Sequence, residues 1–244
     1  MEYGSGIDGL NMKKIQLFCI PYAGGTAEAF DGIRKYLPEE IELTALDYAG
    51  HGTRRKEAYY PSFDDMAKDM AEQMNARIDK SLETAVFGYS MGSVVAYEML
   101  AQGRVDADVS KLFFAAHEAP GEKWGSASYV QMDDLEFAHK LMEFGGFDRF
   151  EDRFLQNKYF RKMFFEPIRE DYRLIADYRL KHDEKLSGDA VFFYAPQDVS
   201  AEAVRKWSAR FEKEPEYIEI GRNHFFLKEY PEELAGLIAK HLQV

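Results

Sequence analysis

One serine lies in a pattern that is typical of an enzyme nucleophile. Gly88-Tyr89-Ser90-Met91-Gly92 matches G-x-S-x-G, and it follows the apolar run Thr84–Tyr89 and precedes a helical pattern. A serine on such a strand-to-helix turn projects its hydroxyl above the sheet, while the flanking glycines prevent collisions between the two elements. Because the pattern alone occurs by chance in roughly one chain in ten of this length, its position between strand and helix carries the prediction that Ser90 is a nucleophile.

A serine nucleophile needs a base, and one of the six histidines stands where that base is expected. His224 follows the apolar run Tyr217–Ile220 and precedes the last helical pattern. His51 lies in a glycine-flanked loop that could line the entrance of the site, but the sequence offers it no partner. We therefore expect His224 to accept the Ser90 proton.

Two acids could orient the imidazole, because each follows a predicted strand. Asp198 comes after Ala190–Ala195, and Glu118 comes after Lys111–Ala116. Asp198 is favoured, and the order Ser90, Asp198, His224 along the chain is that of α/β-hydrolases. Glu118 remains the alternative.

Two backbone N–H groups are expected to stabilise the oxyanion that forms on a carbonyl substrate. One is that of Met91, directly after the nucleophile, and the other that of Ala23, in the glycine-bearing turn after the first core strand. Four further side chains are expected to contact substrate: Tyr22, Tyr89, His117 and Phe225.

The elements that must position these residues alternate between strand and helix, which predicts an α/β fold with a mostly parallel central sheet and helices on both faces. The predicted strands are Ile15–Pro21, Ile41–Asp47, Thr84–Tyr89, Lys111–Ala116, Ala190–Ala195 and Tyr217–Ile220. The predicted helices between and after them are Ala27–Leu37, Ser62–Ile78, Ser93–Gln102, Ala201–Phe211 and Pro231–Leu242.

One stretch breaks this alternation. Residues 124–185 contain no convincing strand but four helical patterns: Asp133–Glu143, Arg149–Asn157, Tyr159–Phe165 and Pro167–Leu180. We interpret them as a helical lid inserted into a core formed by residues 13–123 and 186–244, after a flexible leader at 1–12. Within the lid, residues 147–185 hold nine aromatic residues and a net charge of +1. The aromatics either line a channel for substrate or only pack the insert onto the core.

Composition excludes several classes of function. The net charge of -12 argues against nucleic acid as a partner, and the apolar runs are too short to span a membrane. A single cysteine, Cys19, excludes an internal disulfide and cysteine-based zinc sites. We expect a cytoplasmic monomer that needs no metal or other cofactor.

Three stretches together resemble the type II thioesterases that accompany nonribosomal peptide and polyketide synthases. They are Pro21-Tyr22-Ala23-Gly24-Gly25, Gly88-Tyr89-Ser90-Met91-Gly92 and His224-Phe225-Phe226-Leu227. In the lid, Asp133-Asp134-Leu135-Glu136-Phe137 and the stretch from Pro167 to Leu174 are similar to the lid-helix patterns of that family. The resemblance covers residues 13–244. It implies an α/β-hydrolase fold and hydrolysis of stalled or misprimed acyl groups from the phosphopantetheine arm of acyl or peptidyl carrier proteins.

The chain departs from the family pattern at His51, at His117-Glu118 and at Asn223, which puts the shape of the pocket in doubt more than its chemistry. Two other functions stay open: a hydrolase of small esters or peptides, and a hydrolase-like protein that only binds. Because the resemblance implies acidic carrier proteins, we expect them to dock on the least acidic surface. The candidate cations are Arg161, Lys162, Arg169 and Arg173 in the lid and Arg54, Arg55 and Lys56 near the rim.

Overall fold

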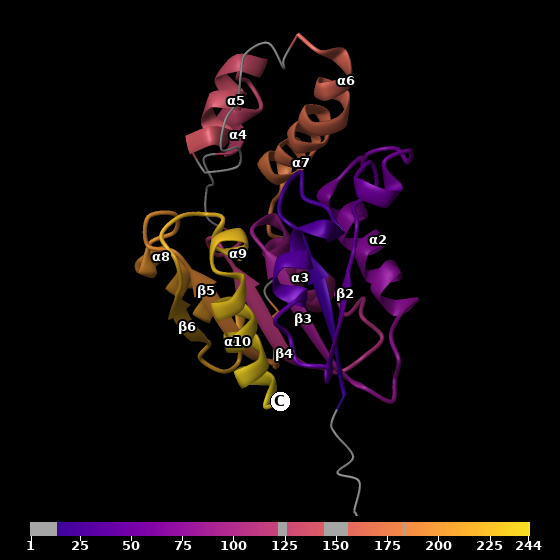
Figure 1. Cartoon of the computed structure of the whole chain (residues 1–244), viewed down its shortest axis with the longest axis vertical. Coiled ribbons are helices and arrows are strands. Elements are labelled where there is room, and N and C mark those ends of the chain that lie inside the picture. The colour runs from indigo at the N-terminus through magenta and orange to yellow at the C-terminus, as the bar shows by residue number, and fades with distance from the viewer. Residues whose placement is uncertain (1–13, 122–125, 144–155, 183) are drawn as a thin grey trace, which may run out of the picture.

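A six-stranded parallel sheet forms the centre of the protein (Figure 1). The computed structural model describes residues 14–121, 126–143, 156–182 and 184–244. The strand order is β2-β1-β3-β4-β5-β6. The strands are β1 (Ile15–Ile20), β2 (Ile41–Ala45), β3 (Glu83–Tyr89), β4 (Val109–Ala115), β5 (Asp189–Tyr194) and β6 (Glu216–Glu219). All six predicted strands are present, and the predicted α/β class is confirmed.

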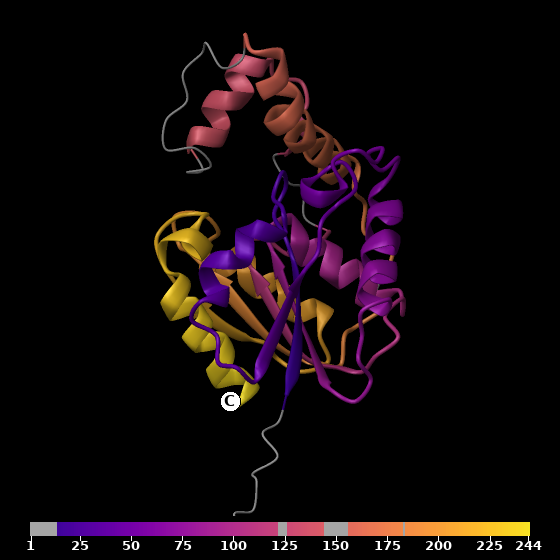
Figure 2. The same ribbon diagram turned by 45° about the vertical axis from the view of Figure 1, so that its right-hand side comes forward.

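Helices cover both faces of the sheet, as the view in Figure 2 shows. On one face lie α1 (Asp31–Arg34) and α10 (Pro231–Leu242), which contact each other. On the other lie α2 (Phe63–Asn75), α3 (Met91–Ala101) and α8 (Ala201–Arg205). The hydroxyl of Ser62 accepts the N–H of Asp65 at 3.2 Å and so caps the start of α2.

Strand β1 explains why the core strands read as continuous apolar runs. Leu17 and Cys19 pack on the side of α1 and α10, whereas Phe18 and Ile20 pack on the side of α2 and α3. Because successive side chains of a strand point to opposite faces, a strand covered on both faces carries apolar residues on both. Gln16 is the polar exception in β1, and its amide donates to the Thr84 hydroxyl at 2.8 Å.

Two predicted helices are each divided into a short α-helix and a 3-10 segment. In place of Ala27–Leu37 the chain forms a 3-10 turn at Ala27–Phe30 and then α1. In place of Ala201–Phe211 it forms α8 and then a 3-10 segment at Lys206–Arg210. Apolar residues three apart, such as Phe30 and Ile33, bury one face of a 3-10 turn as well as one of an α-helix, so spacing alone did not distinguish them.

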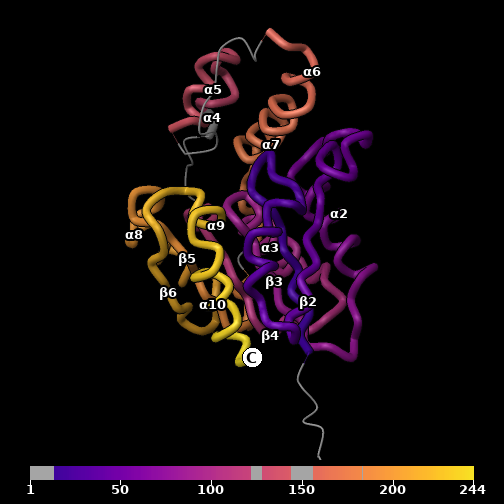
Figure 3. The backbone as a smooth tube through the Cα atoms, in the orientation of Figure 1, coloured from indigo at the N-terminus to yellow at the C-terminus, as the bar shows by residue number. Residues whose placement is uncertain are grey.

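The helices between β4 and β5 lie beyond the carboxyl ends of the strands (Figures 1 and 3). They are α4 (Ser126–Tyr129), α5 (Asp134–Glu143), α6 (Lys158–Phe160), a π-helical turn at Arg161–Phe165 and α7 (Glu166–Asp177). We call α4 to α7, with the π-helical turn, the lid helices. Most of the predicted helix Arg149–Asn157 and the whole of the leader at 1–12 lie outside the described residues.

The lid helices have a small core of their own, formed by Phe137, Ala138, Leu141 and Phe165. Arg169 of α7 stacks 4.6 Å above the ring of Phe137 and binds Asp134 of α5 at 3.0 Å. These contacts join α5 to α7. In the part of the chain that the structure describes, no helix is both long and apolar enough to cross a membrane.

Candidate active site

Ser90 occupies a sharp turn between β3 and α3. Its φ of 53° and ψ of -120° are rare for a residue with a side chain. A Cβ at Gly88 would clash with the backbone of Gly92, and one at Gly92 would clash with the carbonyl of Ile20. Both positions of the motif therefore require glycine, and the turn has the geometry of a nucleophile elbow.

Ser93 holds this turn against the neighbouring strand. Its hydroxyl accepts the N–H of Ala115 at 3.0 Å and donates to the carbonyl of Gly88 at 2.8 Å. The N–H of Ser90 donates to the carbonyl of Ala115 at 2.8 Å. Ser93 was not singled out from the sequence, although a polar residue in the otherwise apolar first turns of α3 was a signal of such a role.

His224 and Asp198 lie side by side above the carboxyl edge of the sheet. Nδ1 of His224 donates to Oδ2 of Asp198 at 2.8 Å, and the two side chains are 17% and 9% exposed. Asp198 follows β5, and the loop of His224 follows β6. Of the two acids considered from the sequence, Asp198 is the one placed against Nδ1; the carbonyl of Glu118 instead accepts Nδ1 of His117 at 2.8 Å.

The loop that carries His224 is fixed from two directions. The hydroxyl of Tyr89 donates to the His224 carbonyl at 2.6 Å and accepts the N–H of Leu227 at 3.3 Å. The side chain of Asn223 accepts the N–H of Phe225 at 2.9 Å and donates to Glu229 at 2.8 Å. The departure from the family pattern at Asn223 thus supplies two side-chain hydrogen bonds to this loop.

The expectation that Tyr89 contacts substrate needs correction. Its side chain is fully buried and is not part of the cavity wall. It lies at the end of β3, where it packs against the rings of Phe87 and Phe226. Tyr89 therefore acts on the site through the backbone of His224.

One expected oxyanion donor directly follows Ser90, and the other lies in a loop that lines the same cavity as Ser90. The N–H of Met91 is the first of α3, and a helix leaves its first four N–H groups without an acceptor of its own. Ala23 lies in the loop after β1, and its N–H donates to no protein acceptor among the described residues. Ala23 is part of the cavity wall, whereas Met91 is buried directly after the nucleophile.

A cavity of about 890 Å³ connects these residues with the lid helices. From the core it is lined by Ser90, Asp198, His224, Ala23, Tyr22, His117 and Phe225. From the lid helices it is lined by Tyr129, Leu141, Lys162, Met163, Phe164, Pro167, Ile168, Tyr172 and Ile175. Three of the four expected substrate contacts, at Tyr22, His117 and Phe225, are thus in its wall.

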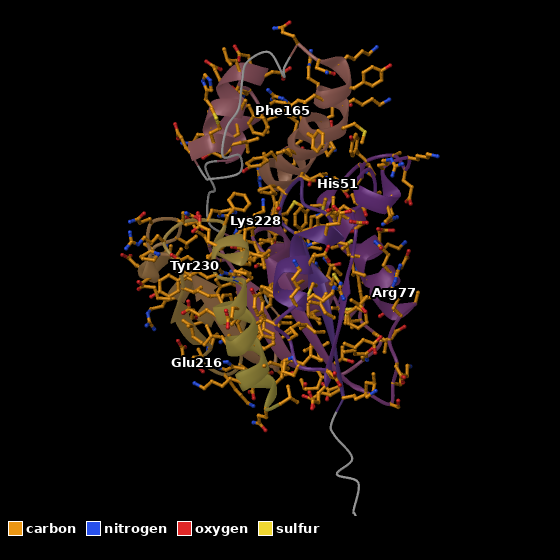
Figure 4. All side chains as sticks on the ribbon, viewed as in Figure 1. His51, Arg77, Phe165, Glu216, Lys228 and Tyr230 are labelled. Atoms are coloured by element: carbon orange, nitrogen blue, oxygen red, sulfur yellow. The ribbon has the colours of Figure 1, made fainter. Side chains whose placement is uncertain are left out.

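His117 and Lys228 set the polarity of the wall near His224. Desolvation, with a smaller contribution from the charge of His224, lowers the pKa of His117 to about 4, so it is neutral at pH 7. Lys228 lies 4.8 Å above the ring of Phe225 and 5.6 Å above that of Tyr22. Figure 4 labels Lys228 at the top of the core, below the lid helices.

The described residues contain no group of three or more His, Cys, Asp or Glu side chains able to hold a metal ion.

Most of the cations expected to dock a partner have acidic neighbours of their own. Arg161 and Arg169 bind Asp134 at 2.9 and 3.0 Å. Arg173 binds Glu170 at 2.9 Å, and Arg54 binds Glu57 at 2.6 Å and also Asp69. In contrast, Lys162, Arg55 and Lys56 are exposed and form no ion pair within the described ranges.

A model of the family described as "Thioesterase domain" matches residues 15–242. The gramicidin S biosynthesis protein GrsT of Aneurinibacillus migulanus is 26% identical, over 95% of this chain and 90% of its own length. The thioesterase PikA5 of Streptomyces venezuelae is 25% identical, over 94% of this chain and 82% of its own length.

Solved structures are similar over the same length. ClbQ from the colibactin NRPS/PKS pathway has a TM-score of 0.85 and 25% identity, and it covers 95% of this chain and 98% of its own. The type II thioesterase BorB from the borrelidin biosynthetic cluster has a TM-score of 0.81 and 26% identity, with 94% and 93% covered. From the family match and the fold, the chain belongs to the thioesterase domain family of α/β-hydrolases, and it is a type II thioesterase.

Proposed function

We propose that the protein hydrolyses acyl thioesters carried on the phosphopantetheine arm of acyl or peptidyl carrier proteins, and so clears stalled or misprimed acyl groups. The observation that supports this most is that His224, paired with Asp198, lines the same cavity as Ser90, under a roof of mostly apolar side chains of the lid helices. A roof of this kind accepts an acyl chain while the thioester carbonyl reaches Ser90.

The reaction would proceed in two acyl-transfer steps. His224, oriented by Asp198 through Nδ1, takes the Ser90 proton at Nε2 while Ser90 Oγ attacks the thioester carbonyl. The N–H groups of Met91 and Ala23 stabilise the oxyanion, and the thiol leaves with the proton from His224. Water then attacks the acyl-enzyme with the same base, which releases the acid and restores Ser90. These steps use only the groups of the chain and water.

The experiment compares substrates that share one acyl group. Turnover is measured on an acylated carrier protein, on the same acyl pantetheine thioester and on an aryl ester, for wild type and Ser90→Ala. We expect the carrier-bound thioester to have the highest kcat/KM and Ser90→Ala to lose at least about 10⁴-fold on all three. A preference for the aryl ester would favour the small-ester hydrolase, and no turnover together with no labelling by a fluorophosphonate would favour a binding protein.

The carrier protein is proposed to dock beside the π-helical turn of the lid. Tyr159, Met163 and Phe164 are 82%, 53% and 55% exposed, which is unusual for large apolar side chains. Lys162 lies between them in sequence, and it lines the cavity together with Met163 and Phe164. This apolar and basic surface therefore borders the cavity on an otherwise acidic protein, which suits an acidic carrier whose arm must enter there.

We also propose that the enzyme acts in the cytoplasm, as a monomer beside a bacterial synthase.

Its single cysteine, Cys19, is buried in β1, and burial raises the pKa of its thiol far above the usual value. Such a thiol is unreactive, so Cys19 does not compete with Ser90 as nucleophile.

A further inference from the structure

A buried carboxylate of the lid contacts the loop of Ala23. Oδ2 of Asp171, on α7, accepts the N–H of Gly24 at 2.7 Å. The same oxygen lies 3.0 Å from Nε2 of His51, which makes an ion pair when His51 is protonated. Both side chains are 2% exposed. Figure 4 shows His51 where α7 meets the core.

Asp171 interrupts the apolar face of α7. The other buried residues of this helix are Pro167, Leu174 and Ile175. A carboxylate in such a place costs several kcal/mol unless it is paired and hydrogen-bonded. Asp171 meets this condition through Gly24 and His51, which lie in two loops of the core, so its burial is compensated where α7 packs on the core.

His51 is suited to hold that charge. Its Nδ1 lies 3.0 Å from the carbonyl of Ala49 and its Nε2 faces Asp171, so both ring nitrogens face oxygen atoms, as in the protonated form. Burial, the largest single influence, would lower the pKa of His51, but the charge and hydrogen bonding of Asp171, the Ala49 carbonyl and the charge of Asp47 together raise it above its usual 6.5. The pair is therefore a charged link between lid and core.

The conformation and the packing of Gly24 restrict how its loop can move against α7. Its φ of +74° favours glycine, and a Cβ there would clash with Ile168, one turn before Asp171 on α7. The residue before Gly24 is Ala23, the proposed oxyanion donor. The lid thus fixes this loop by a hydrogen bond and by close packing at one point.

We propose that Asp171, held by His51, is a positioning residue for catalysis: it fixes the Gly24 backbone so that the Ala23 N–H points to the oxyanion, and the oxyanion hole is complete only when α7 is docked. This rests on the proposed function, because that function assigns the oxyanion role to Ala23. Docking of the lid would then switch on the chemical step as well as enclose the acyl chain.

The test compares Asp171→Ala with Asp177→Ala, which removes an exposed carboxylate from the last turn of the same helix. A small acyl pantetheine thioester is used, so that docking of a carrier plays no part. We expect Asp171→Ala to lower kcat about 10- to 100-fold, since misplacing a catalytic group by about 1 Å costs up to 10²-fold. KM should stay within about twofold, and Asp177→Ala should resemble wild type.

Asp171→Asn serves as the conservative variant if Asp171→Ala does not fold. Its amide oxygen can take the place of Oδ2 and accept the Gly24 N–H, but it offers His51 no negative charge. We expect kcat to fall only about three- to tenfold. A rise of KM at unchanged kcat in either variant would overturn the proposal, because Asp171 would then only shape the pocket. Values within twofold of wild type would overturn it as well.

Reaction with a fluorophosphonate separates this inference from the proposed function. Phosphonylation of Ser90 also builds negative charge on an oxygen in the oxyanion hole, so Asp171→Ala should slow it by a factor similar to that for kcat. If wild type reacts with the probe but hydrolyses no thioester, the proposed function fails. The ratio of the probe reaction rates of wild type and Asp171→Ala then still tests the role of Asp171. An unchanged ratio would refute that role.

Discussion

Two histidine–aspartate pairs lie on the side of the sheet that faces the lid helices, one within the core and one between the core and the lid. His224 and Asp198 are 2.8 Å apart, with side chains 17% and 9% exposed. His51 and Asp171 are 3.0 Å apart, and both side chains are 2% exposed. The residue types and the spacings are almost the same, whereas the solvent access differs.

That difference separates the two roles. Asp198 occupies Nδ1 of His224, so the proposed mechanism assigns proton transfer to Nε2, and His224 lines the cavity. His51 also lines this cavity, but its Nδ1 faces the Ala49 carbonyl and its Nε2 faces Asp171, so both nitrogens are directed at protein oxygen atoms rather than at substrate. A histidine–carboxylate pair is therefore a catalytic candidate only where the second nitrogen reaches the substrate site.

The sharpest test of this comparison replaces each histidine by glutamine. His224→Gln removes the base, and we expect kcat on an acyl thioester to fall on the order of 10⁴- to 10⁶-fold. His51→Gln leaves the base and the nucleophile in place and should cost less than about tenfold. Thermal melting of both variants provides the folding control. Comparable losses of kcat would erase the distinction drawn here.

The second test concerns the acid that orients His224. Asp198→Asn keeps the size of the side chain but favours the wrong imidazole tautomer, so we expect a loss of about 10⁴-fold in kcat. Glu118→Gln alters another part of the cavity wall and should cost less than about tenfold. The measurement is kcat of both variants on the same acyl thioester. A larger loss in Glu118→Gln than in Asp198→Asn would mean that Glu118 orients His224.

The site residues at the strand ends of the core were predictable, because each follows a strand that the local sequence pattern indicates. Ser90 lies between a strand and a helix, and the loops of Asp198 and His224 follow predicted strands. Since all six strands are parallel, their carboxyl ends meet at one edge, and residues far apart in the chain converge there.

The contact between lid and core was not predictable in the same way. The sequence gives no clue that His51 meets Asp171, since 120 positions separate them and no local pattern encodes that meeting. One signal was present: Asp171 falls at helical spacing between Pro167 and Ile175, so an acid lies on an apolar face. The ion pair between Arg161 and Asp134 could not be predicted for a similar reason, because Asp134 lies in another helix. This pair makes Arg161 a poorer candidate for docking a partner.

The third test asks whether the outer surface of the lid serves the partner rather than the chemistry. Lys162→Glu should lower kcat/KM on a carrier-bound thioester about five- to twentyfold, through lost attraction to the carrier, with an effect that fades at high salt. A small soluble thioester should be hydrolysed nearly as by wild type. Arg161→Glu is the matched control, since Arg161 already binds Asp134. Equal effects on both substrates would mean that Lys162 shapes the pocket.

The smallest expected effect is on stability, and it concerns the buried pair alone. Because the pKa of His51 is raised in the folded protein, the pair stabilises the fold fully below about pH 6.5, and this contribution is lost as the pH rises through the raised value. Asp47 also acts on His51, and Tyr48 and Tyr59 lie beside it. Burial above all raises the pKa of both tyrosines, so they stay neutral across this range.

Melting temperatures of wild type and His51→Gln between pH 5.5 and 9 would measure this contribution. The difference should be widest at acid pH and narrow as the pH rises, and it should amount to a few degrees, since 1 kcal/mol corresponds to roughly 2–4 °C in a chain of this size. His241→Gln is the control, because its partner Glu216 is 59% exposed and such pairs contribute little. A difference that is constant with pH would show that His51 stabilises the protein by packing, and the charged link between lid and core would have to be abandoned.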